Sequence, residues 1–236
     1  MTELKNKIKQ ILFDADDTLW ENNIYYMEAN RNFFDLITSA GFSQEDVIKD
    51  FDILEMNVIK ERGYGSINYI YILEELFKKY NELADGKLDY KRLQDIILRF
   101  REHPVKKPRV FEDVNKTLKY LQGKYKLYIL TKGDKEEQSG KIIRSGLDKR
   151  VDDYFVLPEK SDKEYKAILQ KFNWNAQETC MVGNSPKSDI NPALRCGMYA
   201  IHIPYRDTWK VDLEPIVDSQ QRLIVLKSFG ELKTVL

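Results

Sequence analysis

The sequence predicts an α/β fold, in which a doubly wound, parallel, Rossmann-like sheet forms the core and an all-α helical bundle is inserted into it as a cap. Three observations predict this fold. An apolar segment near the start of the chain ends in several carboxylates, a long stretch of helical pattern follows it, and the remainder alternates between strand and helix patterns. Such alternation is typical of parallel sheets that carry helices on both faces.

The first strand is expected over residues 8–13, because Ile11, Leu12 and Phe13 form a continuous apolar run of the kind found in strands covered on both faces. No second strand pattern follows before residue 105. Instead, apolar residues recur at steps of three and four, as on one face of a helix. Glycine-containing breaks divide this stretch into four expected helices, over residues 22–40, 44–62, 67–81 and 89–102.

After residue 105, short apolar runs alternate with helical patterns. We expect strands over residues 126–130, 154–157, 179–182, 199–203 and 221–226, and helices over residues 113–122, 135–144, 162–172 and 187–196, with a short helix at the end. The predicted domains are a core of residues 1–20 and 106–236 and a cap of residues 21–105. Because doubly wound sheets bind ligands beyond the carboxyl ends of their strands, the residues that follow each strand are the candidate functional residues.

Three carboxylates, Asp14, Asp16 and Asp17, directly follow the first expected strand. Like charges a few ångströms apart resist ionising together, so such a site normally holds a cation or shares a proton. Asp14 and Asp16 are two residues apart and therefore face the same side of an extended segment, whereas Asp17 points elsewhere. One carboxylate of the pair could attack or bind a metal while its neighbour, with a raised pKa, passes protons. An acidic turn without function is the alternative; a calcium loop is excluded, because Leu19 and Tyr25 stand where it needs glycine and glutamate.

Polar residues also follow three of the later strands. Thr131 and Lys132 precede a helix and could bind an anion, although Thr131 could equally cap that helix. Lys160 and Lys163 stand at the start of the next helix, where most lysines are merely solvated. A glycine turn delivers Asp189 to the first turn of another helix, where the dipole favours an acid and where it could also reach the acids of the first strand. All of these residues fall at one predicted edge of the sheet, which makes a shared site the better explanation.

The charge balance excludes several classes of function. Lysine plus arginine equals aspartate plus glutamate, at 38 each, so there is no broad basic field for nucleic acid or for an anionic membrane surface. No window is long and apolar enough to span a bilayer, and the apolar run near the N-terminus is broken at Asp14 before it reaches signal-peptide quality. Cys180 and Cys196 are expected to be thiols rather than a disulfide. We expect a cytoplasmic protein that is a monomer or a homodimer.

Four segments resemble the four motifs of the haloacid dehalogenase (HAD)-like hydrolase superfamily. They are Phe13-Asp14-Ala15-Asp16-Asp17-Thr18-Leu19, Thr131, Lys160 and Gly183-Asn184-Ser185-Pro186-Lys187-Ser188-Asp189. The resemblance extends over essentially the whole chain and includes a helical cap inserted directly after the first motif. It implies membership of the phosphatase branch of this superfamily.

The resemblance also implies a role for each matching residue. Asp14 would be the nucleophile that forms an aspartyl-phosphate, and Asp16 would be the acid that protonates the leaving oxygen and then the base that activates water. Mg²⁺ would be held by Asp14, by the backbone carbonyl of Asp16 and by Asp189. The residues that would hold and neutralise the phosphoryl group are Thr131, Lys132 and Lys160.

Two positions leave alternatives open. Lys163 could replace Lys160 as the lysine of the site, although the distance from Lys160 to Gly183 along the chain fits the family better. Asn184 stands where most relatives have an aspartate, so one acidic contact with the metal or its waters is lost. An asparagine can still accept from or donate to a bound water, so Asn184 and Ser185 are expected just outside the metal's own ligands.

These roles predict a Mg²⁺-dependent phosphomonoesterase that acts on a small phosphorylated metabolite, such as phosphoglycolate, a sugar phosphate or a nucleoside monophosphate. Asp16 favours this reaction over haloacid dehalogenation, because a halide leaves without a general acid whereas an alkoxide needs one. A catalytically silent binding protein of the same fold remains an alternative, since fold alone does not fix function. A phosphoacceptor signalling domain fits less well, because it would be about half as long and would have no long helical insertion.

The cap is expected to contact the body of the substrate. Trp20 and the helix break at Tyr64 and Gly65 are the weak candidates for these contacts. Aromatic residues at helical spacing, such as Tyr26 and Tyr69, could also face the cleft, but such residues more often fill a core.

Overall fold

The computed structural model describes residues 2–103 and 105–236. Met1 and Pro104, which fall in the predicted core and cap, lie outside the described residues. The chain divides into two compact units, one of Met1–Asn23 with Lys107–Leu236 and the other of Ile24–Lys106. No helix in the described part of the chain has the length and apolar character needed to cross a lipid bilayer.

The first unit is built on a six-stranded sheet in the order β3-β2-β1-β4-β5-β6, in which neighbouring strands run parallel. β1 lies between β2 and β4, with Ile11 opposite Leu127 on one side and Cys180 on the other. The carboxyl ends of these strands therefore meet at one edge, and the predicted parallel, doubly wound sheet is confirmed. The strands are β1 (Gln10–Phe13), β2 (Lys126–Lys132), β3 (Asp153–Leu157), β4 (Thr179–Gly183), β5 (Tyr199–His202) and β6 (Leu223–Val225).

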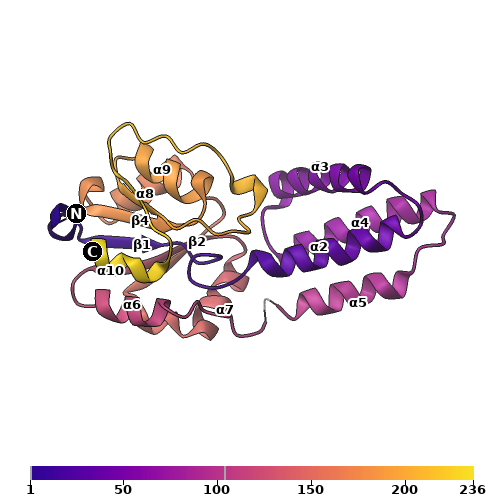
Figure 1. Cartoon of the computed structure of the whole chain (residues 1–236), viewed down its shortest axis with the longest axis horizontal. Helices are drawn as coiled ribbons and strands as arrows, with labels where there is room; N and C mark the ends of the chain where they lie inside the picture. Colours follow the sequence, from indigo (N-terminus) through magenta and orange to yellow (C-terminus); the bar gives the residue numbers. More distant parts are fainter. Residues whose placement is uncertain (1, 104) are drawn as a thin grey trace. The chain divides into compact units, whose positions relative to one another are not determined.

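Helices cover both faces of this sheet (Figure 1). They are α1 (Thr2–Lys7), α6 (Val114–Leu121), α7 (Lys135–Ser145), α8 (Asp162–Lys171), α9 (Asn191–Arg195) and α10 (Leu232–Val235). The first unit has two apolar cores, one on each face of the sheet. The first core contains side chains of α1, α6, α7 and α10, and the second core contains side chains of α8 and α9. Successive side chains of a strand point to opposite faces, so Phe13 of β1 belongs to the first core and Leu12 to the second.

The elements that sequence patterns did not predict are short. α1 has 6 residues, and the remaining elements are single 3₁₀ turns. Segments of this length complete fewer than about two helical turns and therefore display no apolar period. The 3₁₀ turns span Leu147–Arg150, Ala176–Glu178, Lys210–Asp212 and Phe229–Glu231.

The helix predicted over residues 187–196 is interrupted in the structure. Pro186–Ile190 forms a π-helical turn before α9 starts. Pro192 has no backbone N–H, so it cannot donate to the carbonyl of Ser188 four residues earlier. That carbonyl instead accepts a hydrogen bond from the hydroxyl of the buried Tyr165, at 3.0 Å. Pro192 thus interrupts the regular α-helical hydrogen bonding that was expected throughout residues 187–196.

The second unit is a bundle of four helices packed around its own apolar core. The helices are α2 (Asn23–Thr38), α3 (Gln44–Arg62), α4 (Ser66–Leu83) and α5 (Tyr90–Arg101), and the predicted all-helical segment is confirmed. Tyr26 packs edge-on against Tyr69 and Phe100, with ring centroids 4.9 Å and 4.8 Å apart. Tyr69 is buried. Tyr69 therefore lies in the core of the bundle and the partly buried Tyr26 packs against it, so core packing is the interpretation that the structure supports for both.

Candidate active site

Three charged side chains from distant parts of the chain meet at the carboxyl edge of the sheet. Asp14 directly follows β1, and its backbone N–H donates to the carbonyl of Val182 on β4, at 2.9 Å. The ammonium group of Lys160 lies 2.5 Å from Oδ1 of Asp14 and 2.5 Å from Oδ1 of Asp189. All three side chains are buried. The structure thus brings together three of the residues that the sequence analysis singled out.

Asp189 is held in place by the turn that precedes it. Its Oδ2 atom accepts a hydrogen bond from the backbone N–H of Ser185, at 2.9 Å. Gly183 ends β4, and a Cβ atom at this position would lie only 2.2 Å from the same oxygen. A glycine is therefore needed for the carboxylate to lie across the strand end. The hydroxyl of Ser185 accepts from the backbone N–H of Ser188, at 3.0 Å, and so stabilises the turn itself.

Thr18 connects the first motif to the turn after β4. Its hydroxyl donates to Oδ2 of Asp14, at 2.9 Å, and lies 3.2 Å from Oδ1 of Asn184. The backbone N–H of Asn184 donates to the same hydroxyl oxygen, at 3.1 Å. The hydroxyl of Thr18 therefore contacts both Asp14 and Asn184. Sequence reasoning gave Thr18 no role of its own.

Burial and like charge perturb this cluster. Burial is the largest cause that raises the pKa of Asp14, to about 7; the charge of Asp189 adds to the effect and Lys160 opposes it. Burial also raises the pKa of Asp189, again against Lys160. Burial acts to lower the pKa of Lys160, but the two carboxylates outweigh it and raise that pKa well above its usual value. One cation thus faces two carboxylates, so the fully ionised cluster carries excess negative charge.

The donor atoms at this edge suit Mg²⁺. Within residues 2–103 and 105–236, no group of three or more His, Cys, Asp or Glu side chains is arranged to hold a metal. The carboxylates of Asp14 and Asp189 would be the acidic donors to a cation here, and neutral oxygens would complete its coordination. Mg²⁺ is commonly bound by one or two carboxylates together with water. The excess negative charge of the buried carboxylates fits a divalent cation in this position.

Asp16 has different partners from Asp14, although the two are only two residues apart. Its Oδ1 accepts from Nε1 of Trp20, at 2.6 Å, and its Oδ2 accepts from Nε2 of Gln138, at 2.8 Å. The ammonium group of Lys141 lies 2.7 Å and 2.8 Å from the two oxygens. Burial acts to raise the pKa of Asp16, but these three donors together lower it below its usual value. A raised pKa was expected for the carboxylate of the pair that passes protons. In the structure it falls on Asp14 and not on Asp16, because a buried lysine on α7 stabilises the ionised form of Asp16.

Asp17 points away from the other two acids, as its position in the sequence predicts. Its backbone has φ of 62°, and its Oδ1 atom accepts from the backbone N–H groups of Asn22 and Asn23, at 2.8 Å and 3.0 Å. Burial raises the pKa of Asp17 to about 7 in spite of these hydrogen bonds. Asp17 therefore stabilises the segment that leads into α2.

The two residues at the end of β2 have different surroundings. Thr131 is buried, and its hydroxyl has no hydrogen-bond partner among the residues that the structure describes. Lys132 donates to Oδ1 of Asp212 and to the hydroxyl of Ser188, both at 2.8 Å. The ammonium group of Lys132 is thus engaged by protein oxygens that sequence reasoning did not connect with it. Its contact with a phosphate stays a prediction.

The three predicted substrate contacts of the cap fall in different units. Trp20 is fully buried in the core of the first unit, and its indole N–H donates to Asp16. The expectation that its ring faces the substrate is therefore wrong, because the apolar ring packs in the core and its N–H is hydrogen-bonded to Asp16. Tyr64 and Gly65 precede α4 in the second unit, and Gly65 has φ of 132°. Their contact with a substrate stays a prediction.

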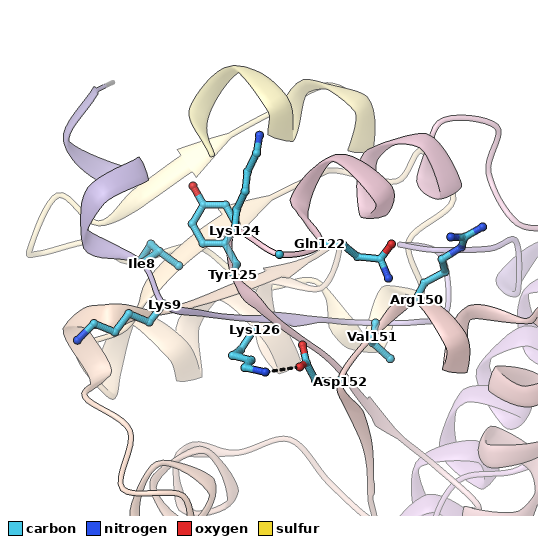
Figure 2. A pocket seen from close by; sticks show the side chains of 10 residues that line it. Ile8, Lys9, Gln122, Lys124, Tyr125, Lys126, Arg150, Val151 and Asp152 are labelled. Carbon is cyan, nitrogen blue, oxygen red and sulfur yellow. Dashed lines mark hydrogen bonds and ion pairs between the residues drawn. The ribbon is translucent and has the colours of Figure 1, made fainter.

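A separate cavity of about 470 Å³ lies at the other edge of the sheet, where β1 and β2 begin (Figure 2). Lys9, Lys126 and Asp152 contribute to its lining. Lys126 pairs with Asp152 at 2.7 Å, and Lys9 pairs with Glu178 at 2.8 Å. Parallel sheets bind ligands beyond the carboxyl ends of their strands, so this cavity at the amino ends is not the candidate active site.

Sequence reasoning missed the partners of Asp16 on α7. Gln138, Lys141 and Ser145 recur at steps of three and four residues and are all buried. Polar residues on the buried face of a helix were the available signal, since a lysine is almost never buried without an anionic partner. Spacing along the helix does not reveal which acid that partner is.

Lys160 and Lys163 form a matched pair for testing this arrangement, because Lys160 is 3% exposed whereas Lys163 is exposed to solvent. Without metal, Lys160→Met is expected to lower the free energy of unfolding by about 3–5 kcal/mol, because it leaves two buried carboxylates without a counter-charge. Lys163→Met is expected to change it by less than about 0.5 kcal/mol. Urea denaturation at pH 7 in the presence of a chelator measures both values. Equal stability of the two variants would contradict the arrangement described.

Comparison with known proteins identifies the family of the chain. A family model described as haloacid dehalogenase-like hydrolase matches residues 8–197. The glyceraldehyde 3-phosphate phosphatase of Methanocaldococcus jannaschii is 31% identical over 202 residues, which cover 83% of this chain and 85% of that protein. The glyceraldehyde 3-phosphate phosphatase of Pyrococcus furiosus is 30% identical over 219 residues, which cover 88% of this chain and 85% of that protein.

Solved structures share the fold of the whole chain. A haloacid dehalogenase-like family hydrolase from Xanthomonas campestris matches with a TM-score of 0.79 and 27% identity, over 97% of this chain and 92% of that one. A predicted phosphoglycolate phosphatase from Haemophilus somnus matches with a TM-score of 0.60, over 97% of this chain and 98% of that one; at 17% identity this match shows the fold alone. Since the family model spans most of the sequence, the chain belongs to the haloacid dehalogenase-like hydrolases.

Proposed function

We propose that this phosphatase of the haloacid dehalogenase-like family hydrolyses a small phosphate monoester in a Mg²⁺-dependent reaction, with the phosphoryl group carried transiently on Asp14. The observation that carries the proposal is the position of Lys160 between the carboxylates of Asp14 and Asp189. Phosphoryl transfer depends mainly on positioning and charge neutralisation, and this cluster offers a nucleophilic oxygen beside a fixed positive charge. The hydroxyl of Thr131 has no hydrogen-bond partner among the residues that the structure describes, so it is available to bind a phosphoryl oxygen.

The chain's own residues account for both steps of the reaction. In the first, an Oδ atom of Asp14 attacks phosphorus, the ester P–O bond breaks, and the leaving oxygen takes a proton from Asp16. In the second, water attacks the phosphorus of the aspartyl-phosphate and gives a proton to Asp16, and the bond between phosphorus and Asp14 breaks. Mg²⁺ held by Asp14, Asp189 and the backbone carbonyl of Asp16 would neutralise charge on the phosphoryl oxygens.

The protonation of Asp16 must change when substrate binds. Its surroundings favour the ionised form, because Lys141, Gln138 and Trp20 together hold its pKa below the usual value against the effect of burial. An anionic phosphate ester brings further negative charge to the site, and like charge favours the neutral form of a carboxyl group. Asp16 therefore takes up its proton as the ester binds and gives it to the leaving oxygen.

Two other functions are less well supported. Haloacid dehalogenation would use Asp14 as nucleophile in the same way, but a halide needs no proton from Asp16. A catalytically silent protein would keep Asp14, Lys160 and Asp189 buried together without use, although burying such charges is costly. Hydrolysis of any phosphate ester distinguishes the proposed function from both.

The named relatives suggest the substrate class. Glyceraldehyde 3-phosphate, on which the relatives from Methanocaldococcus jannaschii and Pyrococcus furiosus act according to their names, is a three-carbon phosphate ester. We extend this class of substrate to the present chain because the similarity covers more than four-fifths of its length in both cases. A triose phosphate also satisfies the expectation of a small phosphorylated metabolite.

A reducing compartment fits the two cysteines. Cys180 is buried and Cys196 is partly buried, and both are free thiols. Proteins that function in oxidising compartments commonly pair their cysteines, whereas cytosolic thiols stay reduced. We therefore propose that the enzyme works in the cytoplasm. Its state as a monomer or homodimer and its action on a small-molecule substrate stay predictions.

Substitution of the two acids tests the proposed reaction with an alkyl phosphate such as glyceraldehyde 3-phosphate, whose alkoxide leaving group needs a general acid. Asp14→Asn is expected to abolish Mg²⁺-dependent phosphate release, because it removes the nucleophile, and Asp16→Asn is expected to lower turnover roughly 10²- to 10⁴-fold. Asp95→Asn, an exposed control on α5, is expected to leave turnover unchanged. A chelator is expected to stop the wild-type reaction. Undiminished turnover by Asp14→Asn, or turnover indifferent to chelation, would sink the assignment.

A panel of phosphate esters tests the substrate class. We expect the highest kcat/KM for glyceraldehyde 3-phosphate when it is compared with phosphoglycolate, a hexose phosphate and a nucleoside monophosphate, with phosphate release measured in the presence of Mg²⁺. A higher kcat/KM for the nucleotide or the hexose would show that the substrate class does not extend from the relatives to this chain.

A further inference from the structure

Lys141 is a buried lysine that takes no direct part in the two steps of the reaction proposed above. It is 2% exposed and lies on α7, far in sequence from the first motif. Its ammonium group is 2.7 Å and 2.8 Å from the two carboxylate oxygens of Asp16 and 3.0 Å from Oδ1 of Asn22. Burying an ammonium group is costly unless it is paired and hydrogen-bonded, and these contacts meet that requirement.

Lys141 acts with two neutral donors on the same carboxylate. Gln138, one turn earlier on α7, donates to Oδ2 of Asp16 and to the backbone carbonyl of Lys132, and the indole of Trp20 donates to Oδ1. Each oxygen of Asp16 therefore accepts two hydrogen bonds, one of them from Lys141. Charge-assisted hydrogen bonds of this kind fix the orientation of a carboxylate. A group that exchanges a proton with a reacting oxygen depends on such a fixed orientation.

The contacts of Asp16 are separate from those of Asp14. Oδ1 of Asp14 faces Lys160 and its Oδ2 accepts from Thr18, whereas Lys141 reaches only the neighbouring acid. The two carboxylates of the first motif are thus held by different lysines, one on α7 and one just before α8. A change at Lys141 should therefore alter the orientation of Asp16 while the contacts of Asp14 stay in place.

We propose that Lys141 is a positioning residue for the acid–base steps, because it holds the carboxylate of Asp16 in the orientation that proton transfer requires. This proposal rests on the proposed phosphatase function. The proton that leaves Asp16 goes to the ester oxygen as the P–O bond breaks, and the proton that returns comes from the attacking water. In both steps Lys141 acts through Asp16 and not on the substrate or on phosphorus.

The test compares two esters that differ in their need for a general acid. Glyceraldehyde 3-phosphate has an alkoxide leaving group, whereas 2,4-dinitrophenyl phosphate has a leaving group stable without a proton. Lys141→Met is expected to lower kcat/KM for the first ester at least about 10-fold more than for the second, because only the first depends on Asp16 as an acid. Lys141→Arg keeps the charge and the donors, so part of the loss should be recovered. Lys135→Met, at the exposed start of α7, is the matched control and should retain both wild-type values.

An equal loss for both esters would overturn the proposal, since it would indicate that Lys141 only stabilises the fold. If Lys141→Met does not fold, Gln138→Met removes one neutral donor to Asp16 and allows the same comparison. It should show the same preference with a smaller loss, and an equal loss would again overturn the proposal. Failure of the wild-type enzyme to release phosphate from either ester would instead contradict the proposed function, and with it this inference.

Discussion

The buried contact of Lys160 with Asp14 and Asp189 is the interaction on which the rest of the site depends. Each carboxylate would be costly to bury alone, and the lysine reduces that cost by facing both. The parallel sheet makes the contact possible, because β1 and β4 are neighbours and their ends deliver the two acids to one edge. Lys160 follows β3 and reaches them across β2, where it lies 3.4 Å from the carbonyl of Leu130. A single lysine leaves one negative charge unbalanced when both carboxylates are ionised, and the proposed Mg²⁺ would balance it.

Two acids separated by one residue have opposite environments in this enzyme. Burial and the charge of Asp189 raise the pKa of Asp14 to about 7, whereas Lys141, Gln138 and Trp20 together outweigh burial and lower the pKa of Asp16. Chemically similar groups thereby acquire different properties from different neighbours. A cation bound beside Asp14 would reduce the cost of ionising this buried carboxylate. The carboxylate of Asp16 is already held in one orientation by its hydrogen bonds. This division is the physical basis for assigning nucleophilic attack to one and proton transfer to the other.

The fold was predictable because its elements are long enough to display a period. The strand around Ile11 and the apolar face of α3 both follow the spacing of side chains that a sheet or a helix must bury. The convergence of Asp14 and Asp189 followed from strand order, but the orientation of Asp16 did not. That orientation is decided by Lys141, a tertiary contact between residues 125 positions apart. Periodicity within one element carries no information about such a pairing.

Chemical trapping of an aspartyl-phosphate can show whether Asp14 carries the phosphoryl group. Borohydride reduces an aspartyl-phosphate to a homoserine side chain, which peptide mass spectrometry locates within the sequence. If Asp14 is the nucleophile, enzyme quenched during turnover of glyceraldehyde 3-phosphate with Mg²⁺ should carry this change at position 14, and enzyme without substrate should not. Phosphate release without any trapped product, or a trapped product at another acid, would rule out Asp14 as the nucleophile.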